Sequence, residues 1–171
     1  EALAVTKDVA EAISVANENM GVVVGAKQQY IWKRAKKTYQ RAIEVTVGEA
    51  DADGSSVAKN LSAMLGFENL KISVQGLLDR GDTPKAVLSD AMQGMTVLDL
   101  AGCELDEVLY YVNRGTPVFA MVSQTEAVLL TGYDASTVTL FDSGVATRKT
   151  LEEAKELFSQ AGNLFFAYLK E

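Results

Sequence analysis

Apolar residues three or four positions apart recur through the first half of the chain and predict helices. One helix is expected over residues 5–20, opened by Thr6 and ended by Gly21. A second should begin at Ser55 or Ser56, because either serine can cap it and the residues that follow carry one apolar stripe: Val57, Leu61, Met64 and Leu65. Two shorter helices complete this half, at residues 72–78 and 84–92; Thr83 should cap the second, with Pro84 in its first turn.

Strand-like patterns dominate the second half. Residues 43–47 alternate between apolar and polar and predict a half-buried strand that ends at Gly48. Later strands are expected at residues 96–100, 117–122, 127–131, 137–141 and 164–169, interrupted by helices at 105–112 and 151–158. The short connection Asp134-Ala135-Ser136 joins two of them as a hairpin, which makes the sheet at least partly antiparallel. Helices followed by a mostly antiparallel sheet indicate an α+β fold.

Composition is that of an ordinary globular domain. With 171 residues, 48% hydrophobic and 23% charged, the chain can bury one good core. None of its apolar runs approaches the roughly 20 residues that a membrane span needs. The chain begins at Glu1, without an initiator methionine or a basic-then-apolar leader, and we expect it to be a piece of a longer protein.

Charge is distributed unevenly. Residues 1–41 hold seven Lys or Arg against four acids, so the remainder must carry −10 to reach the net charge of −7. Such a surface repels nucleic acid and anionic lipid overall, and no nucleic-acid partner is expected. The basic cluster at residues 33–37, with Tyr30, Trp32 and Tyr39 nearby, allows two interpretations. It is either a solvated segment lying against the acidic body or a contact for an anionic polymer.

The residues available for catalysis are few. The chain has no histidine and one cysteine, Cys103. A thiol or serine nucleophile at neutral pH needs a base, which is usually imidazole, so Cys–His and Ser–His–Asp catalysis are both excluded. Cys103 follows Gly102 at the start of a predicted helix, and we expect a packed, mildly reactive thiol there.

Metal and phosphate motifs are weak. The run Asp51-Ala52-Asp53-Gly54 has the spacing that opens a calcium loop, but the bidentate glutamate at position twelve would fall on Ser62. Gly48 and Gly54 lack the lysine and spacing of a phosphate loop. No cofactor and no metal are therefore expected.

Three segments of the second half resemble a known family. They read LDEVLYYVNRGTPVFAMV from Leu105, EAVLLTGYD from Glu126 and LFDSG from Leu140, and they are similar to the bacteriocin-processing, double-glycine leader peptidases of the papain-like superfamily. In that family a helix leads into a strand reading roughly Gly-x-Pro-Val. A histidine opens the next strand, and an Asp or Asn on the following strand orients it. The helix SSVAKNLSAML at residues 55–65 resembles the family's nucleophile helix.

The resemblance covers roughly residues 43–169. It implies a papain-like cysteine-peptidase fold, with N-terminal helices packed on a mostly antiparallel sheet. It also divides the chain into residues 1–42, an N-terminal helix and basic arm, and residues 43–171, a peptidase-like domain. Residues 1–42 have no counterpart in the family.

Most catalytic positions of the family are changed in this chain. The nucleophilic cysteine position falls on Ser56, the histidine on Glu126, the Asp/Asn on Asp142 and the oxyanion-hole glutamine near Ala50. A serine hydroxyl is a far weaker acid than a thiol, and glutamate is a weaker base than histidine at neutral pH. Two neighbouring carboxylates can share a proton but do not activate a serine.

Three functional hypotheses follow. The first is a catalytically inactive peptidase-like domain that binds a peptide or protein segment, or serves as a structural module of a larger bacterial protein of the cell envelope or a secreted one. Ser56, Glu126 and Asp142 would then line the former cleft as binding residues, and other domains of the same polypeptide are further candidate partners. The alternative is a serine-type hydrolase using Ser56 with Glu126 and Asp142. The third is a purely architectural domain whose basic arm docks a polymer or a neighbouring domain.

Overall fold

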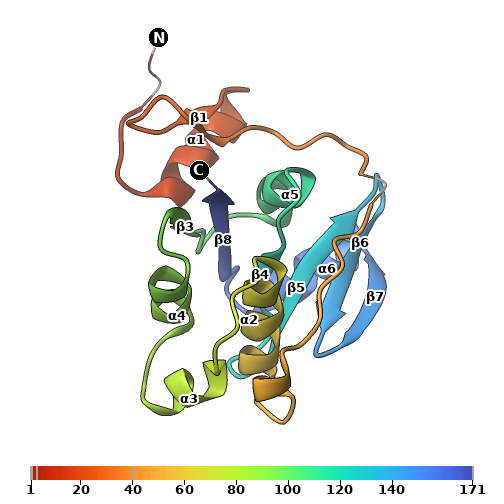
Figure 1. The fold of residues 1–171 in the computed structure, drawn as a ribbon. Coiled ribbons are helices and arrows are strands. Elements are labelled where there is room, and N and C mark those ends of the chain that lie inside the picture. The colour runs from red at the N-terminus through yellow and green to blue at the C-terminus, as the bar shows by residue number, and fades with distance from the viewer. Residues whose placement is uncertain (1, 3, 40, 171) are drawn as a thin grey trace.

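A six-stranded sheet forms the centre of the molecule (Figure 1). The computed structural model describes residue 2, residues 4–39 and residues 41–170. In sheet order the strands are β3 (Met95–Asp99), β8 (Phe165–Lys170), β4 (Val118–Met121), β5 (Ala127–Tyr133), β6 (Thr137–Asp142) and β7 (Val145–Thr150). Each neighbouring pair is antiparallel, and the predicted hairpin joins β5 to β6. The predicted α+β architecture is confirmed.

Helices cover both faces of this sheet. One core lies between α2, α3, α4 and one face, and the other lies between α1, α5, α6 and the opposite face. The helices are α1 (Val9–Glu18), α2 (Ser56–Phe67), α3 (Val74–Asp79), α4 (Pro84–Ala91), α5 (Leu105–Asn113) and α6 (Leu151–Gln160). A 3-10 turn at Glu49–Asp51 precedes α2. Within the described residues, none of these helices has both the length and the apolar character that a membrane span requires.

The central strand β5 is buried on both faces. Ala127 and Leu129 pack in the core beneath α2, whereas Val128 and Leu130 pack in the core on the α5 side. This division follows from the pleat of a strand, which points successive side chains to opposite faces. All seven residues of β5 are buried, so the strand shows no apolar-polar alternation in its sequence.

The first helix has a different cap from the one predicted, and the second has one of its two predicted caps. Asp8, not Thr6, caps α1, and its Oδ1 accepts a hydrogen bond from the Ala10 N–H at 3.0 Å. Ser55 caps α2 by accepting from the Ala58 N–H at 3.1 Å, so Ser56 is the first residue of the helix and not its cap. The expected cap of α4, Thr83, is confirmed.

Residues 43–47 do not form the predicted strand, although their alternation of half-buried and exposed residues is as predicted. Ile43, Val45 and Val47 are half-buried and alternate with exposed residues, but this segment belongs to neither sheet. The Ile43 N–H donates to the Thr131 carbonyl at 2.7 Å, where the β5–β6 register shifts. Gly132 allows this approach, because a Cβ there would lie 3.2 Å from the Ala42 Cα.

Strand β7 was not predicted. Most of its residues are exposed, so it carries no apolar stripe. The signal that marks it is the two-residue turn Ser143-Gly144, where both residues have positive φ angles, 53° and 112°. A two-residue turn of this kind favours a tight hairpin, and here it pairs Asp142 with Val145.

The N-terminal segment shares the core of the later strands. Residues 28–39 form no helix. They include the strand β2 (Tyr30–Trp32), which pairs with β1 (Val23–Val24) as a short hairpin. Ile13 and Trp32 are buried in the core on the α5 side, and the Trp32 indole N–H donates to the Glu107 carbonyl at 2.7 Å. Residue 42 therefore does not mark a gap in the packing, and a domain boundary there stays a prediction.

Candidate functional site

The N-terminus of α2 is fastened to the first residue of β5. The Ser56 Oγ accepts a hydrogen bond from the Ala127 N–H at 3.0 Å and donates to the Ala127 carbonyl at 3.2 Å. A hydroxyl has a single proton to donate. The proton of the Ser56 hydroxyl is therefore donated to a backbone carbonyl, that of Ala127.

One turn further along α2, Asn60 extends this network. It is fully buried, and its amide Nδ2 donates to the carbonyls of Ser56 and Ala127, both at 2.9 Å. Its Oδ1 accepts from the Ser143 N–H at 3.2 Å. Asn60 thus connects α2, β5 and the β6–β7 turn, in a buried network of the kind that rigidifies a fold when its polar groups are satisfied.

Glu126 does not lie beside Ser56. Its carbonyl accepts from the Val122 N–H at 2.9 Å, which continues the β4–β5 ladder by one pair. Val122 packs against the core on the α5 side, whereas Ala127 lies beneath α2. The pleat therefore places the exposed Glu126 on the face of the sheet opposite Ser56.

Asp142 follows the same rule on the next strand. Phe141 packs beneath α2, and Asp142 is exposed, with its Oδ1 accepting from the Ser143 hydroxyl at 2.9 Å. Among the described residues, no hydrogen bond joins the carboxylates of Glu126 and Asp142 to each other or to Ser56. Their assignment as residues that contact a peptide stays a prediction.

The structure thus gathers Ser56, Asn60, Ala127 and Ser143 at the position that the resemblance gives to a catalytic centre. Ala127, not Glu126, is the β5 residue that meets Ser56, and it offers only its backbone. The sequence could not show whether Ala127 or Glu126 meets Ser56. The residues of β5 are apolar towards both faces of the sheet, so their pattern does not indicate which of them faces α2. Asn60 did leave a signal, as a polar residue one turn after Ser56 in an apolar helix.

The residues before Ser56 are also structural. Ala50, at the expected oxyanion-hole position, is exposed in the 3-10 turn and has no side-chain donor. The neighbouring Asp51 is buried, and its two carboxylate oxygens accept from the backbone N–H groups of Val74 at 3.1 Å and Gln75 at 2.8 Å. Asp51 therefore fixes the start of α3, and both of its oxygens are engaged there.

Cys103 is packed, as expected. It is 1% exposed. Burial, followed by the negative charge of Glu107, raises the pKa of the thiol to about 12. Because the thiolate is the nucleophilic form, this shift acts against the expected mild reactivity.

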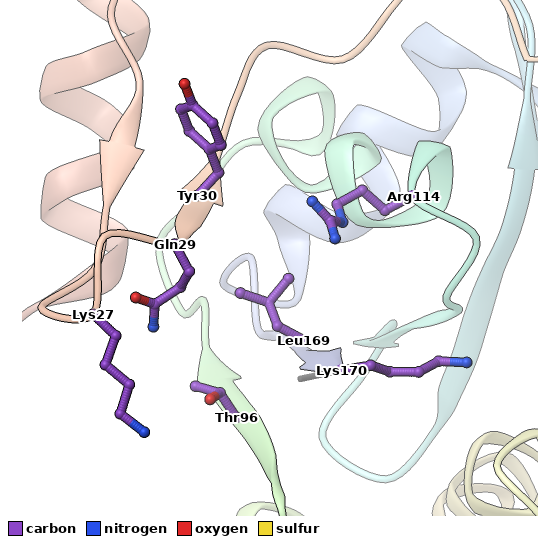
Figure 2. Close-up of a pocket in the computed structure, with 7 residues that line it drawn as sticks. All are labelled: Lys27, Gln29, Tyr30, Thr96, Arg114, Leu169 and Lys170. Carbon is purple, nitrogen blue, oxygen red and sulfur yellow. The ribbon is translucent and has the colours of Figure 1, made fainter.

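A separate hollow of about 340 Å³ lies near the β1–β2 hairpin and β8 (Figure 2). Its lining includes three cations, Lys27, Arg114 and Lys170. Figure 2 shows the amines of Lys27 and Lys170 pointing away from one another, and the Lys170 amine lies 3.3 Å from a Glu68 carboxylate oxygen. The cations therefore do not converge on one point, as an anion site requires.

Comparison with known proteins supports the fold. No family model and no curated protein sequence matches the chain. A crystal structure of a protein from Bacillus anthracis, described as a C39-like peptidase, aligns with 75% of this chain and 98% of its own, with a TM-score of 0.61 and 13% sequence identity. The predicted papain-like α+β fold is thereby confirmed.

Proposed function

We propose that this chain is a catalytically inactive peptidase-like domain that acts as a protein-binding or structural module of a larger bacterial protein, one of the cell envelope or a secreted one. One observation carries the proposal. In a chain without histidine, the Ser56 hydroxyl is held on both its donor and acceptor sides by the backbone of Ala127.

The chemistry of a serine nucleophile explains why this contact matters. The hydroxyl must pass its proton to a base while a lone pair attacks the substrate carbonyl. Here the proton of Ser56 is donated to a peptide carbonyl, which is not a base at neutral pH. The methyl side chain of Ala127 cannot replace that carbonyl as a proton acceptor. These contacts favour a structural role for Ser56.

The alternative is a serine-type hydrolase that uses Ser56 with Glu126 and Asp142. Bringing Glu126 to the α2 face would require β5 to shift by one residue. Such a shift moves each side chain of the strand to the other face. Both faces of β5 are packed in separate cores, with Leu129 in one and Leu130 in the other, so the fold resists that rearrangement.

A peptidase scaffold can still bind without catalysis. Extended peptides are recognised through main-chain hydrogen bonds and side-chain pockets, and those contacts do not need the nucleophile. Ser56 is already occupied, whereas Glu126 and Asp142 are exposed at the ends of β5 and β6. We therefore assign the contact with a peptide, or with another domain of the same polypeptide, to the carboxylates of Glu126 and Asp142. Ser56 would take part in this contact through its backbone only.

A peptide-library digest tests the proposal. The purified chain is incubated with a diverse peptide mixture and the products are read by mass spectrometry, with Ser56→Ala as the matched control. We expect the two proteins to give the same spectra, without new cleavage products. Cleavage by the unmodified chain that is lost in Ser56→Ala would establish the hydrolase instead.

A further inference from the structure

The segment after α1 is strongly basic. Residues 19–43 contain six Lys or Arg and no acid, which leaves the rest of the chain at −13. Within it, residues 33–39 and 41 run as an extended segment, here called the basic strap, from β2 towards the end of β5 (Figure 1). The strap thus concentrates positive charge on an otherwise acidic protein.

The strap is held to the body by its backbone and its aromatic ring. The Tyr133 hydroxyl donates to the Lys36 carbonyl at 2.6 Å. The Tyr39 ring stacks on Tyr133 with centroids 5.5 Å apart and an interplanar angle of 11°. These contacts order the segment without using its charged side chains, which are exposed: Lys33, Arg34, Lys36, Lys37 and Arg41.

The charges of the strap are not neutralised by the acidic body. Among the described residues, no ion pair involves any of these five side chains. Arg34 donates to the Asn17 carbonyl at 2.8 Å, and the Lys33 amine lies 3.7 Å above the Tyr30 ring. Exposed cations of this kind fit both interpretations of this segment, so a contact surface is favoured only by the apolar side chains beside them.

Exposed apolar side chains adjoin the strap. Val24 pairs directly with Tyr30 across the β1–β2 hairpin, so the two share one face. Val24 is 47% exposed and Tyr30 is 49% exposed. Val22, two residues before Val24, is 48% exposed, and Met20 in the preceding turn is 87% exposed. Since Tyr30 also carries Lys33, the apolar and cationic groups form one continuous surface.

We propose that the β1–β2 hairpin and the basic strap form a docking surface for an anionic lipid bilayer. Polybasic segments are attracted to anionic headgroups. Aliphatic side chains beside lysines insert at the boundary of headgroups and acyl chains, and tyrosine is enriched at that depth. Nucleic acid would use the cations but not the exposed valines, because its affinity comes mainly from phosphate contacts.

The negative charge of the remaining chain does not prevent this contact. Electrostatic repulsion between exposed charges is screened over a Debye length of about 8 Å at physiological salt. The surface includes none of the residues around Ser56, so it is independent of the proposed function.

Vesicle flotation tests the proposal with the full chain. The protein is mixed with vesicles of phosphatidylcholine alone or of equal parts phosphatidylcholine and phosphatidylglycerol. We expect binding to the anionic vesicles, weakening as salt is raised, and no binding to the neutral ones. A short DNA duplex serves as the competing ligand in the same buffer.

Two pairs of variants locate the surface. Lys33→Glu with Lys37→Glu is expected to lower partitioning at least about 25-fold, since each lysine near an anionic membrane contributes roughly fivefold. The matched double variant Lys71→Glu with Lys85→Glu changes the net charge equally on exposed residues of the α3 and α4 side and should bind nearly as the unmodified chain does.

The apolar contribution is tested by Val22→Ser with Val24→Ser, which should also weaken binding to vesicles. Its control is Val145→Ser with Leu164→Ser, at exposed apolar positions elsewhere. Absence of binding to anionic vesicles would overturn the proposal. So would equal losses in the test and control variants, or binding to DNA that depends on Lys33 and Lys37 without binding to vesicles.

Discussion

Single residues explain why the centre of this fold is rigid. Asn60 makes three hydrogen bonds with three different elements and is fully buried. Ser56 adds two more to the same strand residue, Ala127. The polar groups of both residues hold the helix α2 to the strand β5.

Asn60→Ala tests this structural role. The substitution leaves the buried Ala127 carbonyl and the partly buried Ser143 N–H with fewer partners, and an unsatisfied buried polar group costs about 1–3 kcal/mol. We expect the free energy of unfolding to fall by roughly 2–3 kcal/mol, measured by urea denaturation. The exposed Gln124→Ala should change it little. An equally small effect of Asn60→Ala would show that the network is dispensable.

Glu107 gives the molecule a pH dependence at the residue scale. It is buried, and that burial is the main cause that raises its pKa above 4.5. The folded state therefore binds a proton more tightly than the unfolded state, so this group contributes stability at low pH that is lost as pH rises through the folded pKa.

The variant Glu107→Gln removes this titration. Relative to the variant, the unmodified chain should gain stability as pH falls from neutrality towards 4.5, the ordinary pKa of a glutamate. Urea denaturation of both proteins at several pH values measures the difference. A difference that is constant with pH, or that grows with rising pH, would contradict the assignment.

At the scale of elements, the register of β5 separates Glu126 from Ser56. Because residue 126 faces the α5 side, a histidine placed there cannot act as the base for residue 56. In Ser56→Cys, adding Glu126→His should leave the rate of thiol alkylation at neutral pH unchanged, as should adding Gln124→His in the adjacent turn. A histidine in contact would raise the rate on the order of tenfold or more by stabilising the thiolate.

Elements with clear apolar periods could be predicted from the sequence, and the others could not. The stripe of α2 and the Thr83-Pro84 start of α4 placed those helices to within a residue or two. β7 lacks an apolar face and was missed. Residues 43–47 alternate correctly, but their sequence could not reveal that the bulge at Thr131 would receive them.

The site was predictable only in part. The resemblance led to Ser56, the start of β5 and the end of β6, and the structure brings those segments together. It did not select Ala127 over Glu126, because β5 is apolar towards both cores. Asn60 was overlooked because a polar residue within an apolar helix stripe was not weighed as a contact.

For the whole molecule, the N-terminal segment and the peptidase-like part form one packed body. Trp32 and Tyr111 pack in the core that the two parts share. The Tyr111 hydroxyl also donates to the Ile31 carbonyl at 2.9 Å. The helix, hairpin and strap thus add a surface of their own, positive and partly apolar, at a distance in the sequence from Ser56, Glu126 and Asp142.

Covalent capture of Ser56 tests the central claim most directly. The chain is exposed to a serine-reactive fluorophosphonate and its intact mass is measured, with Ser56→Ala as the control. Because the Ser56 proton is donated to the Ala127 carbonyl and, within the described part of the chain, no basic side chain is hydrogen-bonded to that hydroxyl, we predict no adduct on either protein. A fluorophosphonate adduct that maps to Ser56 and disappears in Ser56→Ala would contradict the account.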